Sequence, residues 1–200
     1  MANISAADVK KLREKTGVGM MDCKKALTEC EGDFEKAIKF LREKGIADAQ
    51  KRSGRTTKEG VIYSYIHPGN KIGVMVEINC ETDFVARNDT FHTFAKDVAM
   101  HIAASSPVCI SRDQVSTEAL EAERDVLINQ AKESGKPENV IQKIVDGRIE
   151  KYYSQVCLLE QPYIKDMNIS VEDYLKETVG KIGENIQIRR FTRYQLGEEE

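Results

Sequence analysis

One short stretch combines an aromatic side chain with charged neighbours in a way that suits binding to another protein. Residues 80–89 read CETDFVARND, and Phe84 stands there directly after Asp83 and shortly before Arg87. An aromatic side chain contributes most to binding when it is fully desolvated at the centre of an interface. One hypothesis is therefore that Phe84 is a hydrophobic tip that enters a pocket on a partner. The alternative is that Phe84 packs under the following helix while Asp83 caps a backbone end.

Regular elements on both sides place this stretch at a junction. The run before it alternates apolar and other residues, which predicts a strand; its apolar members are Ile72, Val74, Val76 and Ile78. The run after it has apolar residues at helical spacing, which predicts an amphipathic helix; they are Phe91, Phe94, Ala95, Val98 and Ile102. Asn88 or Asp89 can accept the first free N–H groups of that helix. Residues 82–87 are therefore predicted to lie at a strand-to-helix junction.

A pair of methionines is a second candidate contact. Met20 and Met21 follow Gly17-Val18-Gly19 at the predicted start of a helix. Methionine is flexible and polarisable, so the pair is either ordinary core filler or an adaptable exposed contact for a partner helix. Two hydrophobic tips, one in each predicted module, indicate a protein that grips another protein at two places.

The first 45 residues predict a compact bundle of three helices. Ser5 with Asp8 resembles a capping box that opens the first helix, and Gly17 ends that helix. A second helix starts at about Met21, and Gly32-Asp33 ends it and caps a third helix that Gly45 closes. Residues 46–60 are basic and carry small polar residues, which predicts a solvated linker, with an RNA contact as the alternative.

Residues 61–200 predict a second module that mixes strands and helices. Residues 61–66 and 72–79 form a hairpin around Pro68-Gly69-Asn70. Residues from about 117 to 155 form a helical hairpin broken at Gly135 and Pro137, and residues 158–164 form an irregular return. A short helix opened by Ser170 and a last strand over 186–196, with a bulge near Arg189-Arg190, complete the module. The fold class is therefore α+β: a three-helix bundle, then a small antiparallel sheet packed with helices and a helical hairpin.

Composition excludes several classes of protein. Charged residues make up 32% of the chain, which indicates a soluble globular protein, and the formal charge of −3 argues against wholesale coating of nucleic acid. No apolar run approaches the length of a membrane span, and the N-terminus has no signal-peptide core, so we expect the chain to work in the cytoplasm.

No motif for catalysis or metal binding stands out. The five cysteines include no Cys-x-x-Cys pair and are expected to be small core residues in a reducing compartment. The three histidines have no metal-ligand spacing, so we expect no structural zinc; they are His67, His92 and His101. The Gly17-Val18-Gly19 sequence follows a helix and is no dinucleotide loop. Nothing supports an enzyme or a cofactor.

Two long motifs closely resemble those of the elongation factor Ts family. They are TGVGMMDCKKAL at residues 16–27 and TDFVAR at residues 82–87, supported by Gly135-Lys136-Pro137, Gly147-Arg148 and Gln161-Pro162. The resemblance covers nearly the whole chain. It implies a guanine-nucleotide exchange factor for elongation factor Tu in bacterial translation elongation, without covalent chemistry. It also implies that the N-terminal bundle is of the ubiquitin-associated type.

The resemblance also implies residue roles. Phe84 would enter between helices of the partner's nucleotide domain, near its magnesium and phosphate site, within a loop that includes Thr82, Asp83 and Val85. Leu12, Met20 and Met21 would pack on another helix of that domain. Weaker candidates for partner contact are Lys24, Arg87, Asn88 and His101. Long members of the family carry a duplicated core, whereas this chain has one hairpin and one such loop, so a homodimer is predicted.

Two other functions compete with this interpretation. An RNA-binding module would use basic residues of the linker and the last strand: Lys51, Arg52, Arg55, Arg189, Arg190 and Arg193. They are not interleaved with stacking aromatic residues, as a single-strand platform requires. A generic scaffold would use its small bundle to capture ubiquitin-like or helical partners. We expect neither direct nucleic-acid binding nor a membrane.

Overall fold

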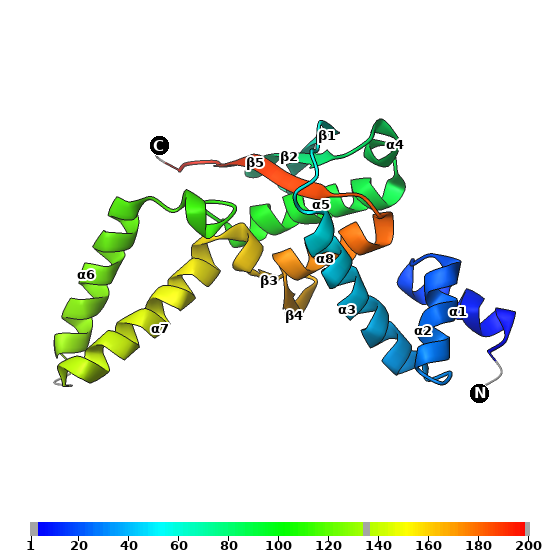
Figure 1. The fold of residues 1–200 in the computed structure, drawn as a ribbon. Helices are drawn as coiled ribbons and strands as arrows, with labels where there is room; N and C mark the ends of the chain where they lie inside the picture. The colour runs from blue at the N-terminus through cyan, green and yellow to red at the C-terminus, as the bar shows by residue number, and fades with distance from the viewer. Residues whose placement is uncertain (1–3, 134–136, 199–200) are drawn as a thin grey trace. The chain divides into compact units, whose positions relative to one another are not determined.

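The computed structural model describes residues 4–133 and 137–198 (Figure 1). The predicted break at Gly135, the motif residue Lys136 and the last two residues of the acidic tail lie outside the described residues. The chain divides into two compact units. The first unit holds residues 1–63, 77–96 and 173–188, and the second holds 64–76, 97–172 and 189–200. The predicted domains are parts that would fold independently, which is a different property from compactness. The division into 1–45, 46–60 and 61–200 therefore stays a prediction.

The described residues mix helices with two small sheets, which confirms the α+β class. One sheet has three strands in the order β1 (Glu59–Ile66), β2 (Ile72–Cys80) and β5 (Ile186–Gln195). The other sheet pairs β3 (Pro162–Tyr163) with β4 (Asp166–Ser170) antiparallel. Within residues 4–133 and 137–198, no helix combines the length and the apolar character needed to cross a membrane.

Three helices open the first unit, as predicted: α1 (Ala6–Thr16), α2 (Met20–Glu29) and α3 (Phe34–Arg52). The capping box is present, because Ser5 Oγ accepts the Asp8 N–H at 3.1 Å and the Asp8 carboxylate accepts the Ser5 N–H at 3.2 Å. Gly17 ends α1 with a positive φ of 71°. The Asp33 carboxylate accepts the Lys36 N–H at 3.0 Å and begins α3. The core between these helices consists of Val9, Leu12, Cys23, Ala26, Leu27, Ala37 and Leu41.

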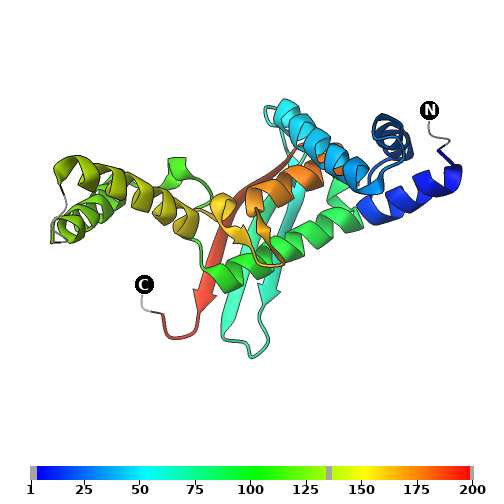
Figure 2. The same cartoon turned by 90° about the horizontal axis from the view of Figure 1, so that it is seen from below.

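The predicted end of the third helix at Gly45 is wrong. The helix α3 continues to Arg52, into the stretch 46–60 that was predicted as a linker. Gly45 lies where α3 crosses α8 (Val171–Ile182), and the two helices lie side by side in Figures 1 and 2. A Cβ atom built on Gly180 of α8 would lie 2.8 Å from the Gly45 Cα atom. The missing side chain at Gly180 therefore allows the close crossing, and Gly45 lies inside α3 at that crossing rather than at the end of the helix.

The hairpin and the last strand are confirmed. Strands β1 (Glu59–Ile66) and β2 (Ile72–Cys80) flank a turn in which Gly69 and Asn70 have positive φ values of 96° and 57°. Strand β5 (Ile186–Gln195) lies on the other side of β2. Its buried positions, Ile186 and Ile188, are followed by two exposed arginines and then by half-buried Phe191. This confirms the predicted change of parity, and the bulge itself stays a prediction.

The second unit contains the helical hairpin of α6 (Thr117–Glu133) and α7 (Glu138–Val156), which lie side by side in both views. Their shared core is Leu127, Ala131, Ile141, Val145 and Ile149. The return over 158–164 is more regular than predicted. A 3-10 turn (Leu158–Glu160) leads into β3 (Pro162–Tyr163), which pairs with β4 (Asp166–Ser170). Such a short pairing leaves little periodicity in the sequence, so pattern alone does not reveal it.

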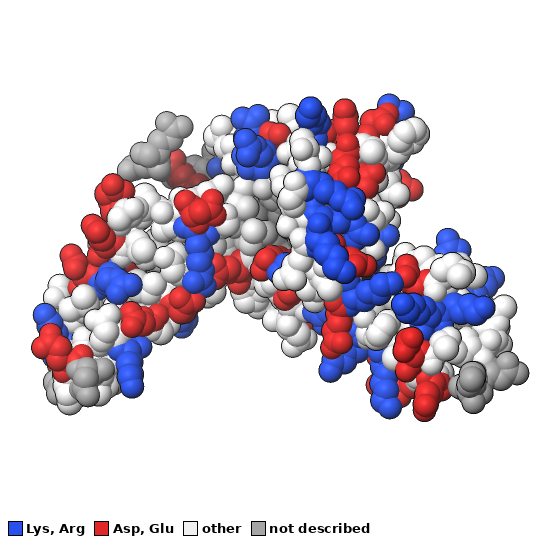
Figure 3. Space-filling view, viewed as in Figure 1, with Lys and Arg blue, Asp and Glu red and all other residues white. Residues whose placement is uncertain are grey.

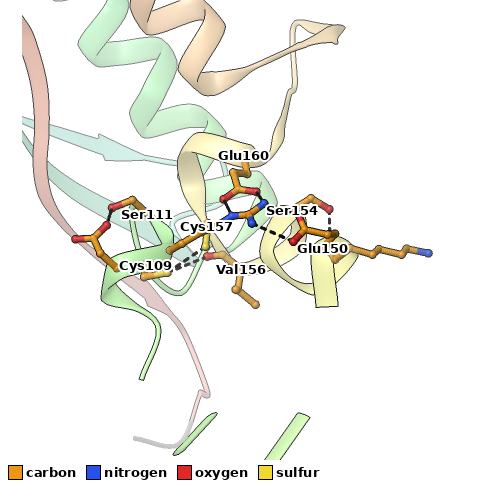
Figure 4. Close-up of polar contacts among 10 residues, drawn as sticks. Cys109, Ser111, Glu150, Ser154, Val156, Cys157 and Glu160 are labelled. Carbon is orange, nitrogen blue, oxygen red and sulfur yellow. Dashed lines mark hydrogen bonds and ion pairs between the residues drawn. The ribbon is translucent and has the colours of Figure 1, made fainter. Parts of the chain in front are cut away.

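Two buried thiols lie at the base of the helical hairpin, beside an arginine that pairs with two glutamates (Figure 4). Cys109 Sγ lies 3.7 Å from Cys157 Sγ, and both are free thiols. Beside them Arg112, in a 3-10 turn (Arg112–Gln114), binds the carboxylates of Glu150 and Glu160. Burial raises the pKa of the Cys109 thiol and raises that of Cys157 to about 12. Cys23 and Cys80 are buried too, as expected of core cysteines, whereas Cys30 is half-buried.

Candidate partner-binding site

A one-turn helix occupies the predicted strand-to-helix junction. The helix α4 (Asp83–Ala86) follows β2 directly and precedes α5 (Asp89–Ser105). Thr82 Oγ1 accepts the Val85 N–H at 3.4 Å and so caps α4. The Asn88 side chain accepts the Thr90 N–H at 2.7 Å, which confirms that Asn88 serves the first turn of α5. The sequence predicted the junction, whereas the α4 turn within it was not expected.

The turn presents Phe84 to solvent. The Phe84 side chain is 82% exposed, while Asp83, Val85 and Ala86 of the same turn are half-buried. The alternative in which Phe84 packs under α5 is therefore wrong for this structure. A large, exposed aromatic side chain gains binding free energy only when something else covers it. The geometry at α4 thus suits an anchor for a partner.

Charged side chains flank Phe84. The Asp83 and Arg87 side chains form an ion pair across the turn, with Oδ2 and Nη2 3.1 Å apart. Arg87 is largely exposed in this pair, so its contribution to stability is small. Arg87 and Asn88 both lie exposed on the same short segment as Phe84. The sequence-predicted loop residues are thus together on one surface.

Hydrogen bonds to a turn that is distant in sequence fix the segment before α4. Glu184 follows α8 and accepts two hydrogen bonds from Thr82, from the backbone N–H at 3.0 Å and from Oγ1 at 2.7 Å. The next residue, Asn185, donates its backbone N–H to Glu81 Oε1 at 2.6 Å. Sequence reasoning missed Glu184 and Asn185, because no spacing rule links residues 102 positions apart.

The methionine pair lies exposed at the start of α2. Met20 is 42% and Met21 is 78% exposed, so Met21 in particular is not core filler. Lys24, one turn further on, is exposed as well. An ion pair between Asp22 and Lys44 ties this end of α2 to α3. The pair belongs to the same unit as the α4 turn.

Two of the predicted contact residues are buried. Leu12 is fully covered within the bundle core, so direct contact of its side chain with a partner would require the bundle to open. His101 is also fully covered, in the second unit, and its imidazole bridges Gln161 Oε1 at 2.9 Å and the Ile164 N–H at 3.3 Å. Desolvation lowers the pKa of His101, so the neutral ring is favoured. The structure gives both residues roles inside the fold.

The basic residues in the last turn of α3 and in the segment before β1 are partly paired within the chain. Figure 3 shows blue side chains gathered where α3 ends, with acidic side chains beside them. Lys51 pairs with Asp48 at 3.7 Å, and Arg55 pairs with Glu81 at 3.4 Å. Pairing of this kind weakens the attraction of the segment for phosphates.

No metal-binding cluster appears in the part of the chain that the structure describes: no three His, Cys, Asp or Glu side chains gather there as ligands. The described surface does offer an exposed aromatic side chain on a fixed turn and a pair of exposed methionines, which suit binding to another protein.

Comparison with known proteins points to one family. The model of the family described as elongation factor TS matches residues 9–198. The chain is 61% identical over 199 residues to elongation factor Ts of Solidesulfovibrio magneticus, with all of both chains covered. It is 60% identical to elongation factor Ts of Desulfosudis oleivorans over 198 residues, which cover 99% of this chain and all of the relative. It is 58% identical to elongation factor Ts of Desulforamulus reducens, with 99% and 91% covered.

Proposed function

The chain belongs to the elongation factor Ts family, and from this premise we propose that it releases GDP from elongation factor Tu and so allows GTP to bind. Membership of the family makes it a nucleotide exchange factor of translation elongation, which performs no covalent chemistry of its own. We place its action in the bacterial cytoplasm.

The observation that carries the proposal is the presentation of Phe84. Its side chain is 82% exposed on a one-turn helix, and Thr82, the residue before that helix, is held by two hydrogen bonds to Glu184. A fixed aromatic tip loses little conformational freedom when it enters a pocket, which favours binding. Phe84 inserts between helices of the partner's nucleotide domain, and Asp83 and Val85 surround it at the interface. Insertion disturbs the site that holds magnesium and phosphate.

Exchange requires that the factor bind the nucleotide-free partner more tightly than the GDP-bound partner. Coupling between two ligands of one protein is reciprocal, so a factor that weakens GDP binding must itself be weakened by GDP. An acceleration of about a thousandfold corresponds to about 4 kcal/mol. A buried aromatic hot spot contributes about 2–4 kcal/mol to binding, so burial of Phe84 and disturbance of the magnesium site together supply the free energy that this acceleration requires. The ratio of GTP to GDP then sets the direction of exchange.

The exposed methionines supply a second contact. Met20 and Met21 pack on another helix of the same partner domain, where flexible thioether side chains adapt to the surface they meet. Lys24 lies beside them and Arg87 and Asn88 lie beside Phe84, as accessory contacts. In this proposal the three-helix bundle is of the ubiquitin-associated type and acts as the second grip.

We propose further that the protein is a homodimer through the outer face of its sheet. Leu196, directly after β5, donates its N–H at 2.8 Å to the carbonyl of Lys71, directly before β2. The end of β5 therefore lies beside the start of β2, so these neighbouring strands run antiparallel. Residues two apart on a strand, and those opposite each other on neighbours, share a face. Ile66 Cδ1 lies 3.2 Å from where a Cβ of Gly73 would be. Exposed apolar and aromatic side chains on this face include Ile66, Met75, Tyr194 and Leu196. An apolar patch of this kind is typical of a protein interface.

The test of exchange is the release of fluorescent GDP from elongation factor Tu. Wild-type protein is expected to accelerate release strongly, and Phe84→Ala is expected to lose most of the acceleration. Met167→Ala removes a comparably exposed hydrophobic side chain from β4, in the second unit, and should leave the rate unchanged. Acceleration that survives Phe84→Ala would retain the function but reject Phe84 as the wedge. No acceleration by the wild type would reject the function.

Sedimentation velocity tests the dimer. The wild type is expected to sediment as a dimer, and a double variant with Met75→Lys and Tyr194→Lys as a monomer. A wild-type protein that is strictly monomeric and fully active in exchange would reject the homodimer.

A further inference from the structure

We propose that Glu184 is a positioning residue for exchange, which holds the Phe84-bearing turn in its binding pose through Thr82. The inference rests on the proposed function, since it assigns to Glu184 the task of presenting the wedge. Glu184 lies in the turn between α8 and β5, and it acts on the partner only through the α4 turn.

The contact between Glu184 and Thr82 fixes both position and direction. Each carboxylate oxygen takes one donor: Oε2 accepts the Thr82 N–H at 3.0 Å and Oε1 accepts Thr82 Oγ1 at 2.7 Å. Hydrogen bonds to an ionised acceptor are roughly twice as strong as neutral ones, and a paired arrangement also sets the angle. Because Thr82 Oγ1 donates to Glu184, its lone pairs stay available to cap the Val85 N–H. One carboxylate thus orients the residue that starts α4.

The turn that carries Glu184 is itself well anchored. Gly183 ends α8 with a φ of 86°, and its N–H donates to the Val179 carbonyl at 2.8 Å. Asn185 is almost fully buried, and its Nδ2 donates to the Arg55 carbonyl at 2.8 Å and to the Ser53 carbonyl at 3.3 Å. Asn185 therefore fastens the turn to the segment after α3.

The α4 turn needs this support from outside. A single helical turn is unstable by itself, because nucleation fixes several residues for one hydrogen bond. The ion pair between Asp83 and Arg87 is exposed and contributes little. Without Glu184, the turn would sample other conformations, and ordering it would weaken partner binding.

The experiment compares GDP release from elongation factor Tu in three variants of the full chain. Glu184→Ala removes both hydrogen bonds and should slow exchange by about tenfold to a hundredfold at a limiting concentration of factor, the size expected for lost hydrogen bonds to a charged acceptor. Glu184→Gln keeps a side chain that can bond Thr82 and should stay within about threefold of wild type. Glu177→Ala is the matched control, since Glu177 lies on α8 and pairs with Arg42 rather than with the loop. Wild-type rates in Glu184→Ala would overturn the proposal.

A double variant separates positioning from general damage. If Glu184 acts only by holding Phe84, then Phe84→Ala combined with Glu184→Ala should exchange no more slowly than Phe84→Ala alone. Losses that multiply in the double variant would overturn the proposal, because Glu184 would then act by another route.

Hydrogen–deuterium exchange keeps the inference distinct from the proposed function. Peptides over residues 81–88 should take up deuterium faster in Glu184→Ala than in wild type or Glu177→Ala, with the bundle peptides unchanged. Unchanged uptake over 81–88 would overturn the anchoring role even if exchange is confirmed. If the wild type releases no GDP, the proposed function fails, and the role of Glu184 in exchange fails with it. In that case, faster uptake over 81–88 in Glu184→Ala would show only that Glu184 orders this segment, and not that it serves nucleotide exchange.

Discussion

Gly45 and Gly180 meet at the crossing of α3 and α8, where a Cβ on Gly180 would lie 2.8 Å from the Gly45 Cα atom. The reverse is not true: a Cβ on Gly45 would lie 3.8 Å from the Gly180 Cα atom, at ordinary contact distance. Glycine inside a helix costs about 1 kcal/mol relative to alanine. The close approach therefore explains glycine at position 180, and it requires less of position 45.

This asymmetry predicts opposite effects of two alanine substitutions. Gly180→Ala should lower the free energy of unfolding by about 1–3 kcal/mol, because the added methyl group has no room beside the α3 backbone. Gly45→Ala should be neutral or slightly stabilising, by up to about 1 kcal/mol. Urea denaturation measures both. Gly147→Ala on α7 is the control, since a Cβ there meets nothing within 4 Å. Equal losses at positions 45 and 180 would contradict the packing described.

Met21 and Leu12 should separate binding from stability. Met21 is exposed, so Met21→Ala should slow GDP release from elongation factor Tu while leaving the midpoint of urea denaturation unchanged. Leu12 is buried in the bundle core, so Leu12→Ala should lower the free energy of unfolding by about 2–5 kcal/mol. Exchange assays and denaturation on the same preparations measure the two effects. A Met21→Ala variant that loses stability without losing exchange would count against the second contact.

His101 predicts a loss of stability in mild acid. Its folded-state pKa is lowered from 6.5 by desolvation, so the unfolded state binds the proton more tightly. Stability should therefore decrease as the pH falls below about 6.5, with a slope of at most about 1.4 kcal/mol per pH unit, until the folded pKa is reached. Denaturation between pH 7.5 and 5 measures it. The carboxyl groups with lowered pKa values, Asp8, Asp33 and Glu150, titrate at lower pH.

A matched pair of variants tests whether His101 causes this dependence of stability on pH. His101→Gln should remove most of it, whereas His92→Gln, at an exposed position on α5, should leave it in place. A slope that persists in His101→Gln would show that another group is responsible.

The buried thiols should resist alkylation. Burial raises the pKa of Cys157 to about 12 and that of Cys80 to about 11, so at pH 8 very little of either is thiolate. Cys30 is half-buried and should react with iodoacetamide first, and Cys30→Ser should remove that first phase. Peptide mass spectrometry follows each site. All five cysteines should react in denaturant, and early modification of Cys157 in the folded protein would contradict its burial.

Much of the local structure and the place of Phe84 between a strand and a helix could be predicted from sequence, because their signals lie within a few residues. Ser5 and Asp8 are one turn apart and form the capping box, and Asp33 begins α3 as its type and position suggest. The alternation before residue 80 and the helical spacing after residue 89 place Phe84 at a junction. Periodicity of this kind is dictated by backbone geometry, so the sequence alone carries it.

The tertiary structure decided what depends on contacts between distant segments. Gly45 looks like a helix end until α8 lies against it. Leu12 and His101 are predicted partner contacts, but packing covers both side chains. Glu184 and Thr82 are 102 residues apart, and neither predicts the other. The sequence determined the local elements and the candidate residues that they carry. Only the folded chain decided which of those residues are exposed, because burial and long-range hydrogen bonds arise when segments far apart in sequence pack together.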